Sequence, residues 1–148
     1  MSLASAPIVR AEMLIRRPVD VVFNAFIDPT ITTKFWFTRG SAPLKPGTMV
    51  SWHWDTYGVS ANVSVVTIEP NHRILILWPN AVEWHFVPKS ADSTFVTITT
   101  SGFQGSDDEV VSQAIDNMGG FSLLLAGCKA WLEHGIQLNL IADHTAQP

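Results

Sequence analysis

Two pairs of acidic and imidazole side chains are the residues of this sequence best suited to chemistry. His53 and Asp55 stand two positions apart in one β-rich segment, and Glu83 and His85 stand two positions apart in another. Imidazole and carboxylate groups bind zinc or iron, and they also act as general acids and bases. No ligand-spacing motif accompanies the four residues, and a solvated face of a sheet accounts for them equally well.

Alternation along these two segments predicts which way the four side chains point. Successive side chains of a strand face opposite sides of a sheet, and the polar residues alternate with large aromatic ones: Trp52, Trp54, Trp84 and Phe86. If the aromatic side chains are buried, the polar ones face solvent. We therefore expect no metal site and no cofactor. If the phase of either strand is reversed, His53 or His85 enters the interior as a general base or a hydrogen-bond anchor.

Cys128 and Arg39 are the remaining candidates for reactive or ligand-binding groups. Cys128 is the only cysteine, so the chain has no internal disulfide, and its apolar helical surroundings are more typical of a small buried side chain than of a nucleophile. Arg39 follows Trp36-Phe37 and is suited to binding a ligand carboxylate, although Arg39-Gly40-Ser41 is also typical of a solvated loop. The motifs GxGxxG, the Walker loop, HExxH and GxSxG are absent, and we assign no catalytic residue.

The elements that would position these residues follow a simple order along the chain. A strand over Ile8–Ile15 precedes a helix from Pro18 to Ile27, which ends at Asp28-Pro29, and a short helix from about Thr30 to Phe35. Turn residues then separate five β-rich segments: Thr48–Trp54, Val59–Ile68, Arg73–Leu77, Ala81–Val87 and Thr94–Phe103. Connections this short predict antiparallel hairpins. The fold class is therefore α+β, with a curved antiparallel sheet of six strands.

A single long amphipathic helix, predicted over Asp107–Ile141, must cover that sheet. At roughly 100° per residue, its apolar side chains fall within about 80° of one another: Ala114, Met118, Phe121, Leu125, Cys128, Leu132 and Ile136. Because sheets twist, such a helix contacts the middle of a sheet better than its ends, which predicts a pocket between the two. Gly119-Gly120 costs roughly 1 kcal/mol per residue relative to alanine, which suggests close backbone packing there.

Aromatic and helix residues on the inward phase are the predicted ligand-binding set. The chain has six tryptophans, and flat rings accept flat apolar ligands against their faces. Trp36 and Phe37, after the second helix, are the candidates for the pocket mouth. Trp78 lies in a segment that is apolar in both phases, so alternation does not predict which face of the sheet it occupies. Core packing alone explains any one of these rings. The predicted ligand-binding residues are Trp36, Phe37, Trp52, Trp54, Trp84, Phe86, Met118, Phe121, Leu125 and Cys128.

Composition excludes several classes of partner. Apolar residues make up 47% of the 148 and charged residues 15%, and the net charge is −4. We expect one domain, residues 1–148, with its core over about 8–141. The sequence has no basic patch of the kind that binds nucleic acid, and no apolar run long enough to span a membrane. It also lacks the pattern of a signal peptide at its start, which favours the cytoplasm. Leu123 and Ile141 lie opposite the apolar stripe, so pairing of two chains through this helix face or an edge strand is an open alternative.

Five segments of the sequence, in this order and spacing, carry a resemblance to a known family: Arg17–Pro29 with Lys34-Phe35-Trp36, Gly47–Trp54, Ile68–Trp78, Thr94–Phe103, and Gly119-Gly120-Phe121 through Glu133. Together they resemble the activator-of-Hsp90-ATPase-homologue-like family over about Val9–Leu140. The resemblance implies a START-like helix-grip fold, shared with the major birch pollen allergen, polyketide cyclases and lipid-transfer domains. It also implies a cavity without a common catalytic set. Family members often have tryptophan where this chain has Phe121, which implies a differently shaped cavity floor.

Three classes of function remain open from the sequence. The preferred hypothesis is a module that binds a small hydrophobic or aromatic molecule between the sheet and the long helix. The second is a cyclase- or dehydratase-like enzyme without metal, which requires an acid or base that faces the cavity. The third is a cochaperone-like role in protein interaction, for which basic surface patches are expected and are not evident in a chain with pI ≈ 5.6.

Overall fold

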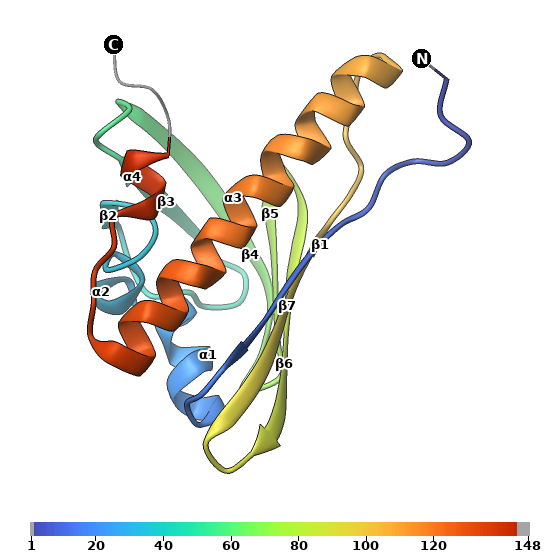
Figure 1. The fold of residues 1–148 in the computed structure, drawn as a ribbon. Coiled ribbons are helices and arrows are strands. Elements are labelled where there is room, and N and C mark those ends of the chain that lie inside the picture. The colour runs from blue at the N-terminus through green and yellow to red at the C-terminus, as the bar shows by residue number, and fades with distance from the viewer. Residues whose placement is uncertain (1, 145–148) are drawn as a thin grey trace.

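Seven antiparallel strands form one curved sheet in the computed structural model, which describes residues 2–144, and a long helix packs on its inner face (Figure 1). The predicted α+β helix-grip fold is thereby confirmed. In chain order the elements are β1 (Val9–Ile15), α1 (Val19–Ile27), α2 (Pro29–Thr32), β2 (Arg39–Gly40), β3 (Met49–Trp54), β4 (Val59–Glu69), β5 (Arg73–Trp78), β6 (Asn80–Ser90), β7 (Ser93–Thr100), α3 (Asp107–His134) and α4 (Leu140–Asp143).

The order of strands across the sheet is β1-β7-β6-β5-β4-β3-β2. From β3 to β7 each strand pairs with the next along the chain, as the short connections predict. β1 pairs with β7, with Val9 opposite Thr100 and Ile15 opposite Thr94. The seventh strand is the two-residue β2, where Arg39 pairs with His53 and Gly40 with Trp52. Two residues carry no alternation, so the sequence predicted only six strands.

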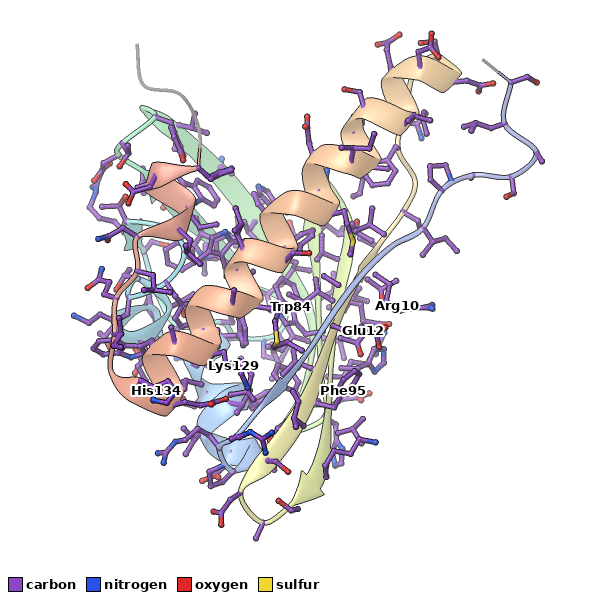
Figure 2. The ribbon with its side chains drawn as sticks, viewed as in Figure 1. Arg10, Glu12, Trp84, Phe95, Lys129 and His134 are labelled. Carbon is purple, nitrogen blue, oxygen red and sulfur yellow. The ribbon has the colours of Figure 1, made fainter. Side chains whose placement is uncertain are left out.

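Alternation along each strand separates a buried face from a polar one. The fully buried side chains of the sheet include Ile74, Ile76, Trp84, Val96 and Ile98. Figure 2 shows Trp84 on the side of α3, whereas Arg10, Glu12 and Phe95 extend from the opposite face of the sheet. The inner face, α3 and α1 together enclose one hydrophobic core.

Helix α3 begins and ends at recognisable caps. The Ser106 hydroxyl accepts from the Glu109 backbone N–H, and the Glu109 carboxylate accepts from the Ser106 N–H, which is a capping box. At the other end Gly135 has φ +66°, a left-handed conformation that favours glycine. The prediction that the helix continues to Ile141 was therefore wrong, because Gly135 ends it and the chain turns back into α4.

The buried stripe of α3 differs in part from the predicted one. Phe121, Leu125 and Cys128 are buried as expected, together with Leu124 and Gly127. Met118 is 42% exposed and Ile136 51% exposed, so their predicted inward positions were wrong. Figure 1 shows the first turns of α3 projecting past the sheet, and Ile136 lies beyond the end of the helix. No helix among residues 2–144 is long and apolar enough to cross a membrane.

Candidate functional site

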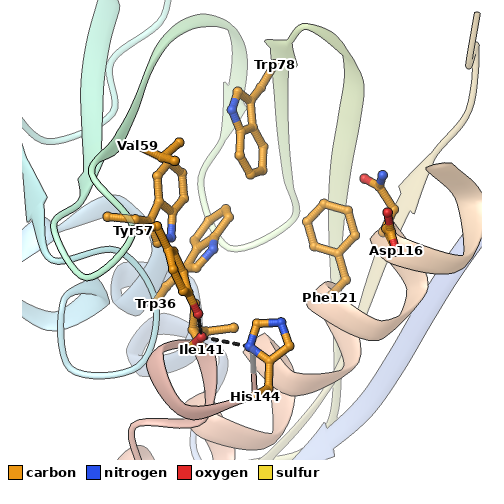
Figure 3. Close-up of a pocket in the computed structure, with 11 residues that line it drawn as sticks. Trp36, Tyr57, Val59, Trp78, Asp116, Phe121, Ile141 and His144 are labelled. Atoms are coloured by element: carbon orange, nitrogen blue, oxygen red, sulfur yellow. Dashed lines mark hydrogen bonds between the residues drawn. The ribbon is translucent and has the colours of Figure 1, made fainter. Parts of the chain in front are cut away.

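A pocket of about 300 Å³ lies at one end of the interface between helix and sheet, where β3, β4 and β5 diverge from α3 and α4 (Figure 3). This volume is at the lower end of the range of about 300–1,000 Å³ that is typical of small-molecule sites. The pocket is lined mainly by apolar groups, and its lining residues are Trp36, Trp54, Tyr57, Val59, Trp78, Asp116, Asn117, Gly120, Phe121, Ile141 and His144.

Three tryptophans form the sheet side of the pocket. Trp54 and Trp78 stand at the ends of β3 and β5, and their rings are parallel within 9° with centroids 5.4 Å apart. The Trp36 ring is inclined by 67° to Trp54 and by 70° to Trp78. Phe121, from α3, is inclined by 79° to Trp78. The rings that line the pocket therefore lie in different planes, so a group placed among them contacts aromatic walls on more than one side.

Helix α4 borders the pocket through Ile141 and the following His144. The left-handed residues Gly135 and Asn139 turn the chain back after α3. The Tyr57 hydroxyl then donates a hydrogen bond to the carbonyl oxygen of Ile141. His144 Nδ1 lies 2.7 Å from the same oxygen, and because a carbonyl only accepts, Nδ1 is the donor. The turn after β3 therefore holds α4 in place through one carbonyl group.

Two glycines lie within α3 beside the pocket, and neither is required by close packing. A Cβ built at Gly119 or at Gly120 meets no heavy atom within 4 Å. The expectation that Gly119-Gly120 marks close backbone contact was therefore wrong. Gly120 lines the pocket whereas Gly119 is exposed. The missing side chain at Gly120 leaves open a volume that most other residues would occupy.

Few polar groups line the pocket. The Asn117 amide donates to the Gln113 carbonyl at 2.8 Å, along the helix. Asp116, an exposed carboxylate on α3, and His144 complete the polar part of the lining. Figure 3 shows the His144 ring directed at the opening between Tyr57 and Phe121, with Asp116 beyond Phe121. The lining thus offers one acidic and one imidazole group at an otherwise apolar site.

Three of the ten predicted ligand-binding residues line this pocket: Trp36, Trp54 and Phe121. Six others are buried core side chains outside the lining: Phe37, Trp52, Trp84, Phe86, Leu125 and Cys128. Phe37, expected at the mouth, is 2% exposed and stacks on Trp52 at 4.9 Å. Met118 points to solvent and is not part of the lining. Burial also raises the pKa of the Cys128 thiol far above its ordinary value, so Cys128 is inert as a nucleophile at neutral pH.

The polar candidates of the sheet lie outside the pocket, as alternation predicted. Glu83 accepts from Arg73 Nε at 2.5 Å and lies 2.6 Å from His85 Nε2. Burial raises the pKa of Glu83, but these two hydrogen bonds outweigh it and leave the pKa below its ordinary value. His53 lines a separate shallow depression next to β2. No group of three or more His, Cys, Asp or Glu residues within 2–144 could hold a metal ion.

Arg39 does not reach the pocket either. Its Nε and Nη2 lie 2.9 and 3.0 Å from the two carboxylate oxygens of Asp55, in a bidentate pair. A hydrogen bond from the guanidinium lowers the pKa of Asp55. This pair forms because β2 brings Arg39 beside His53. The expectation that Arg39 binds a ligand carboxylate at the aromatic mouth is not met by its position.

Sequence reasoning missed most of the lining for three identifiable reasons. Trp78 could not be placed because β5 is apolar on both faces. Ile141 and His144 were assigned to a continuous helix or to the tail, although Gly135 after His134 is a typical C-terminal cap and could have indicated the turn. Tyr57 stands in a turn, where no periodicity applies.

Comparison with known proteins agrees with this architecture. A family model described as "Activator of Hsp90 ATPase homolog 1-like protein" matches residues 16–132. A crystal structure from Staphylococcus saprophyticus is 27% identical, with TM-score 0.80, and the match covers 89% of this chain and 96% of that one. The Aha1 dimer from Colwellia psychrerythraea is 15% identical, with TM-score 0.72 and coverage of 87% and 98%. A START superfamily protein from Mycobacterium smegmatis is 12% identical, with TM-score 0.66 and coverage of 84% and 98%. The last two are similar in fold alone, and no curated protein sequence matches this chain.

Proposed function

This chain belongs to the Activator of Hsp90 ATPase homolog 1-like family, and from that premise we propose that it binds a small hydrophobic or aromatic molecule in the pocket beside α3 and α4. One observation carries the proposal: five aromatic side chains surround an open volume of about 300 Å³ next to a glycine that no packing contact requires. Family membership by itself identifies no ligand.

The physical case rests on how the rings are held. Trp36 contacts the rings of Trp52, Trp54, Trp78 and Trp84 at centroid distances of 4.8 to 6.2 Å, so the aromatic walls are fixed before any ligand arrives. A preformed apolar site loses little side-chain entropy on binding. Each CH₂ group that a ligand buries there contributes about 0.8 kcal/mol.

Tryptophan fluorescence and native mass spectrometry test the proposal. We expect an apolar molecule to co-purify with the protein from its own source, and small aromatic alcohols such as naphthol to quench fluorescence saturably. Gly120→Leu should weaken this saturable quenching more than tenfold, whereas Gly119→Leu, one position along the same helix, should not. A bare protein that no compound quenches would overturn the proposal and favour a protein partner that needs no filled pocket.

A cyclase- or dehydratase-like activity is a second candidate because Asp116 and His144 both line the pocket. Such chemistry needs an acid or base beside a bound carbonyl compound. The enzyme hypothesis predicts that Asp116→Asn or His144→Gln abolishes turnover of a bound polyketone and leaves its binding intact. If the unaltered protein binds such a polyketone and does not convert it, the enzyme hypothesis is excluded for that compound.

A further inference from the structure

We propose that the ligand of this pocket is a cation, with a quaternary or tertiary ammonium group seated among Trp36, Trp78 and Phe121 and with Asp116 as the counter-charge. This inference rests on the proposed function and names the class of ligand. It distinguishes choline-like or amine ligands from fatty acids and other anionic apolar molecules.

The arrangement of the rings is the first part of the argument. An aromatic ring carries negative potential on its faces and positive potential at its edge, so a cation is attracted to a site enclosed by several ring faces. Trp36 and Phe121 are inclined by 70° and 79° to Trp78, so these rings form walls in different planes. Figure 3 shows Tyr57 beside the same opening, extending from the turn after β3 toward Ile141. A roughly spherical trimethylammonium group contacts walls in several planes at once, and its charge adds attraction to the ring faces among them.

The charges around the pocket are the second part. Asp116 is the one acidic side chain among the described lining residues, and that lining includes no Lys or Arg. The basic side chains of the neighbouring elements have other partners: Lys34 lies 5.6 Å from the Trp131 ring centre, Arg39 pairs with Asp55, and Lys129 pairs with Glu133. Apart from the His144 imidazole, a ligand carboxylate would thus meet a carboxylate and aromatic rings, with no lysine or arginine to neutralise it. A ligand ammonium group is complementary to the same surface.

A second depression adjoins the pocket, and its lining has no charged side chain. It shares Trp78 and Asn117 with the pocket, and its other polar side chains include Asn80, Gln104 and Gln113. These are neutral groups, so they can accept or donate hydrogen bonds to an uncharged polar part of the ligand. The pocket and the depression together fit an ammonium head with a neutral polar extension.

The test compares choline with 3,3-dimethylbutan-1-ol, which has the same shape and a carbon atom in place of the charged nitrogen. The readout is the set of six indole Nε1–H signals in ¹H–¹⁵N NMR spectra of the full chain. We expect choline to bind about tenfold more tightly than its neutral isostere, a difference of about 1.4 kcal/mol. The signals of Trp36, Trp54 and Trp78 should move, whereas that of Trp131, which is outside the pocket, should not.

Substitution of the carboxylate locates the counter-charge. Asp116→Asn should weaken choline binding threefold to tenfold and leave the neutral alcohol within twofold. Asp92→Asn, in the exposed turn before β7, changes the net charge equally and should alter neither ligand's affinity. Because Asp116 is exposed, both variants should melt within about 1 °C of the unaltered protein.

The possible failures are distinguishable. If the alcohol binds as tightly as choline at the same indole signals, the cation inference is overturned and the hydrophobic-ligand proposal survives. If choline binds more tightly but Asp116→Asn leaves its affinity unchanged, the assignment of the counter-charge is overturned. If neither these two compounds nor naphthol moves any indole signal, the proposed function fails, and the inference fails with it.

Discussion

Replacing Gly120 by leucine should make the protein more stable and at the same time block its pocket. Gly120 lies inside α3, and a Cβ there meets no heavy atom within 4 Å, so the new side chain enters open space. Removing a glycine from a helix interior gains roughly 0.5–1 kcal/mol. Contact of the leucine with Trp78 and Phe121 adds up to about 1.5 kcal/mol of burial, less about 0.5–1 kcal/mol of side-chain entropy. The net expectation is a gain of about 1–2 kcal/mol.

The effect on binding follows from volume. If each added carbon occupies roughly the 30 Å³ of a water molecule, the four carbons of leucine fill about 120 Å³ of a pocket of about 300 Å³. A ligand that loses burial of two CH₂ groups as a result loses about 1.6 kcal/mol, more than tenfold in affinity. Stability and binding should therefore change in opposite directions.

Thermal unfolding and naphthol titration measure the two effects, with Gly119→Leu as the matched control. A gain of 1 kcal/mol raises the melting temperature of a chain this size by about 2–4 °C. Gly119→Leu should gain only the helix contribution and keep the affinity of the unaltered protein. A lower melting temperature for Gly120→Leu would show that this glycine serves close packing after all. An unchanged affinity would show that ligand does not occupy this pocket.

Three further substitutions probe the elements that hold the pocket. Tyr57→Phe removes the hydrogen bond to the Ile141 carbonyl and should loosen α4 by about 1 kcal/mol, measured as faster amide exchange at its C-terminal end. Glu133→Gln should make stability less sensitive to acid. Burial raises the pKa of the Glu133 carboxyl, but hydrogen bonds from the Arg16 backbone N–H and from Lys129 outweigh this effect, so the folded-state pKa lies below the ordinary 4.5. That stabilisation is present above pH 4.5 and is lost as the pH falls through the folded-state pKa, which melting curves at pH 7 and pH 3.5 should show. Gly40→Ala should destabilise by about 1–3 kcal/mol because its Cβ would lie 2.9 Å from a buried phenyl ring.

Each of these predictions has an outcome that would contradict it. Unchanged exchange across α4 in Tyr57→Phe would contradict the role of that hydroxyl. Equal sensitivity to acid in Glu133→Gln and in the unaltered protein would refute the argument from the hydrogen bonds of Glu133. Gly119→Ala, which meets no neighbour, should be stabilising where Gly40→Ala is destabilising.

Much of the fold was predictable because local patterns decide it. The alternation Trp52-His53-Trp54 and Glu83-Trp84-His85 correctly predicted which side chains are buried. Short turns predicted the hairpins from β3 to β7, and the acids at Asp107–Glu109 predicted the start of α3. These signals depend only on neighbours in the sequence.

The pocket was predictable only in part because its walls come together through tertiary structure. Trp36 and Trp54 were named from the sequence, but so were Trp52 and Trp84, and alternation cannot distinguish an inward ring in the core from one at an open end. That difference depends on where the helix leaves the sheet. Met118 shows the same limit, since its place on the apolar stripe says nothing of whether a strand lies opposite.

The sequence by itself therefore determined the class of fold, the inward phase of the strands that alternate, such as β3, β6 and β7, and the abundance of aromatic side chains on their inner face. Only the tertiary structure decided which rings surround open space, because that depends on the angle at which α3 crosses a curved sheet and on the reversal at Gly135. The same reversal brings Ile141 and His144 to the pocket that Phe121 also lines, and no periodicity in the sequence relates these residues. Periodicity records which face of an element is buried, whereas a cavity is the place where two buried faces fail to meet.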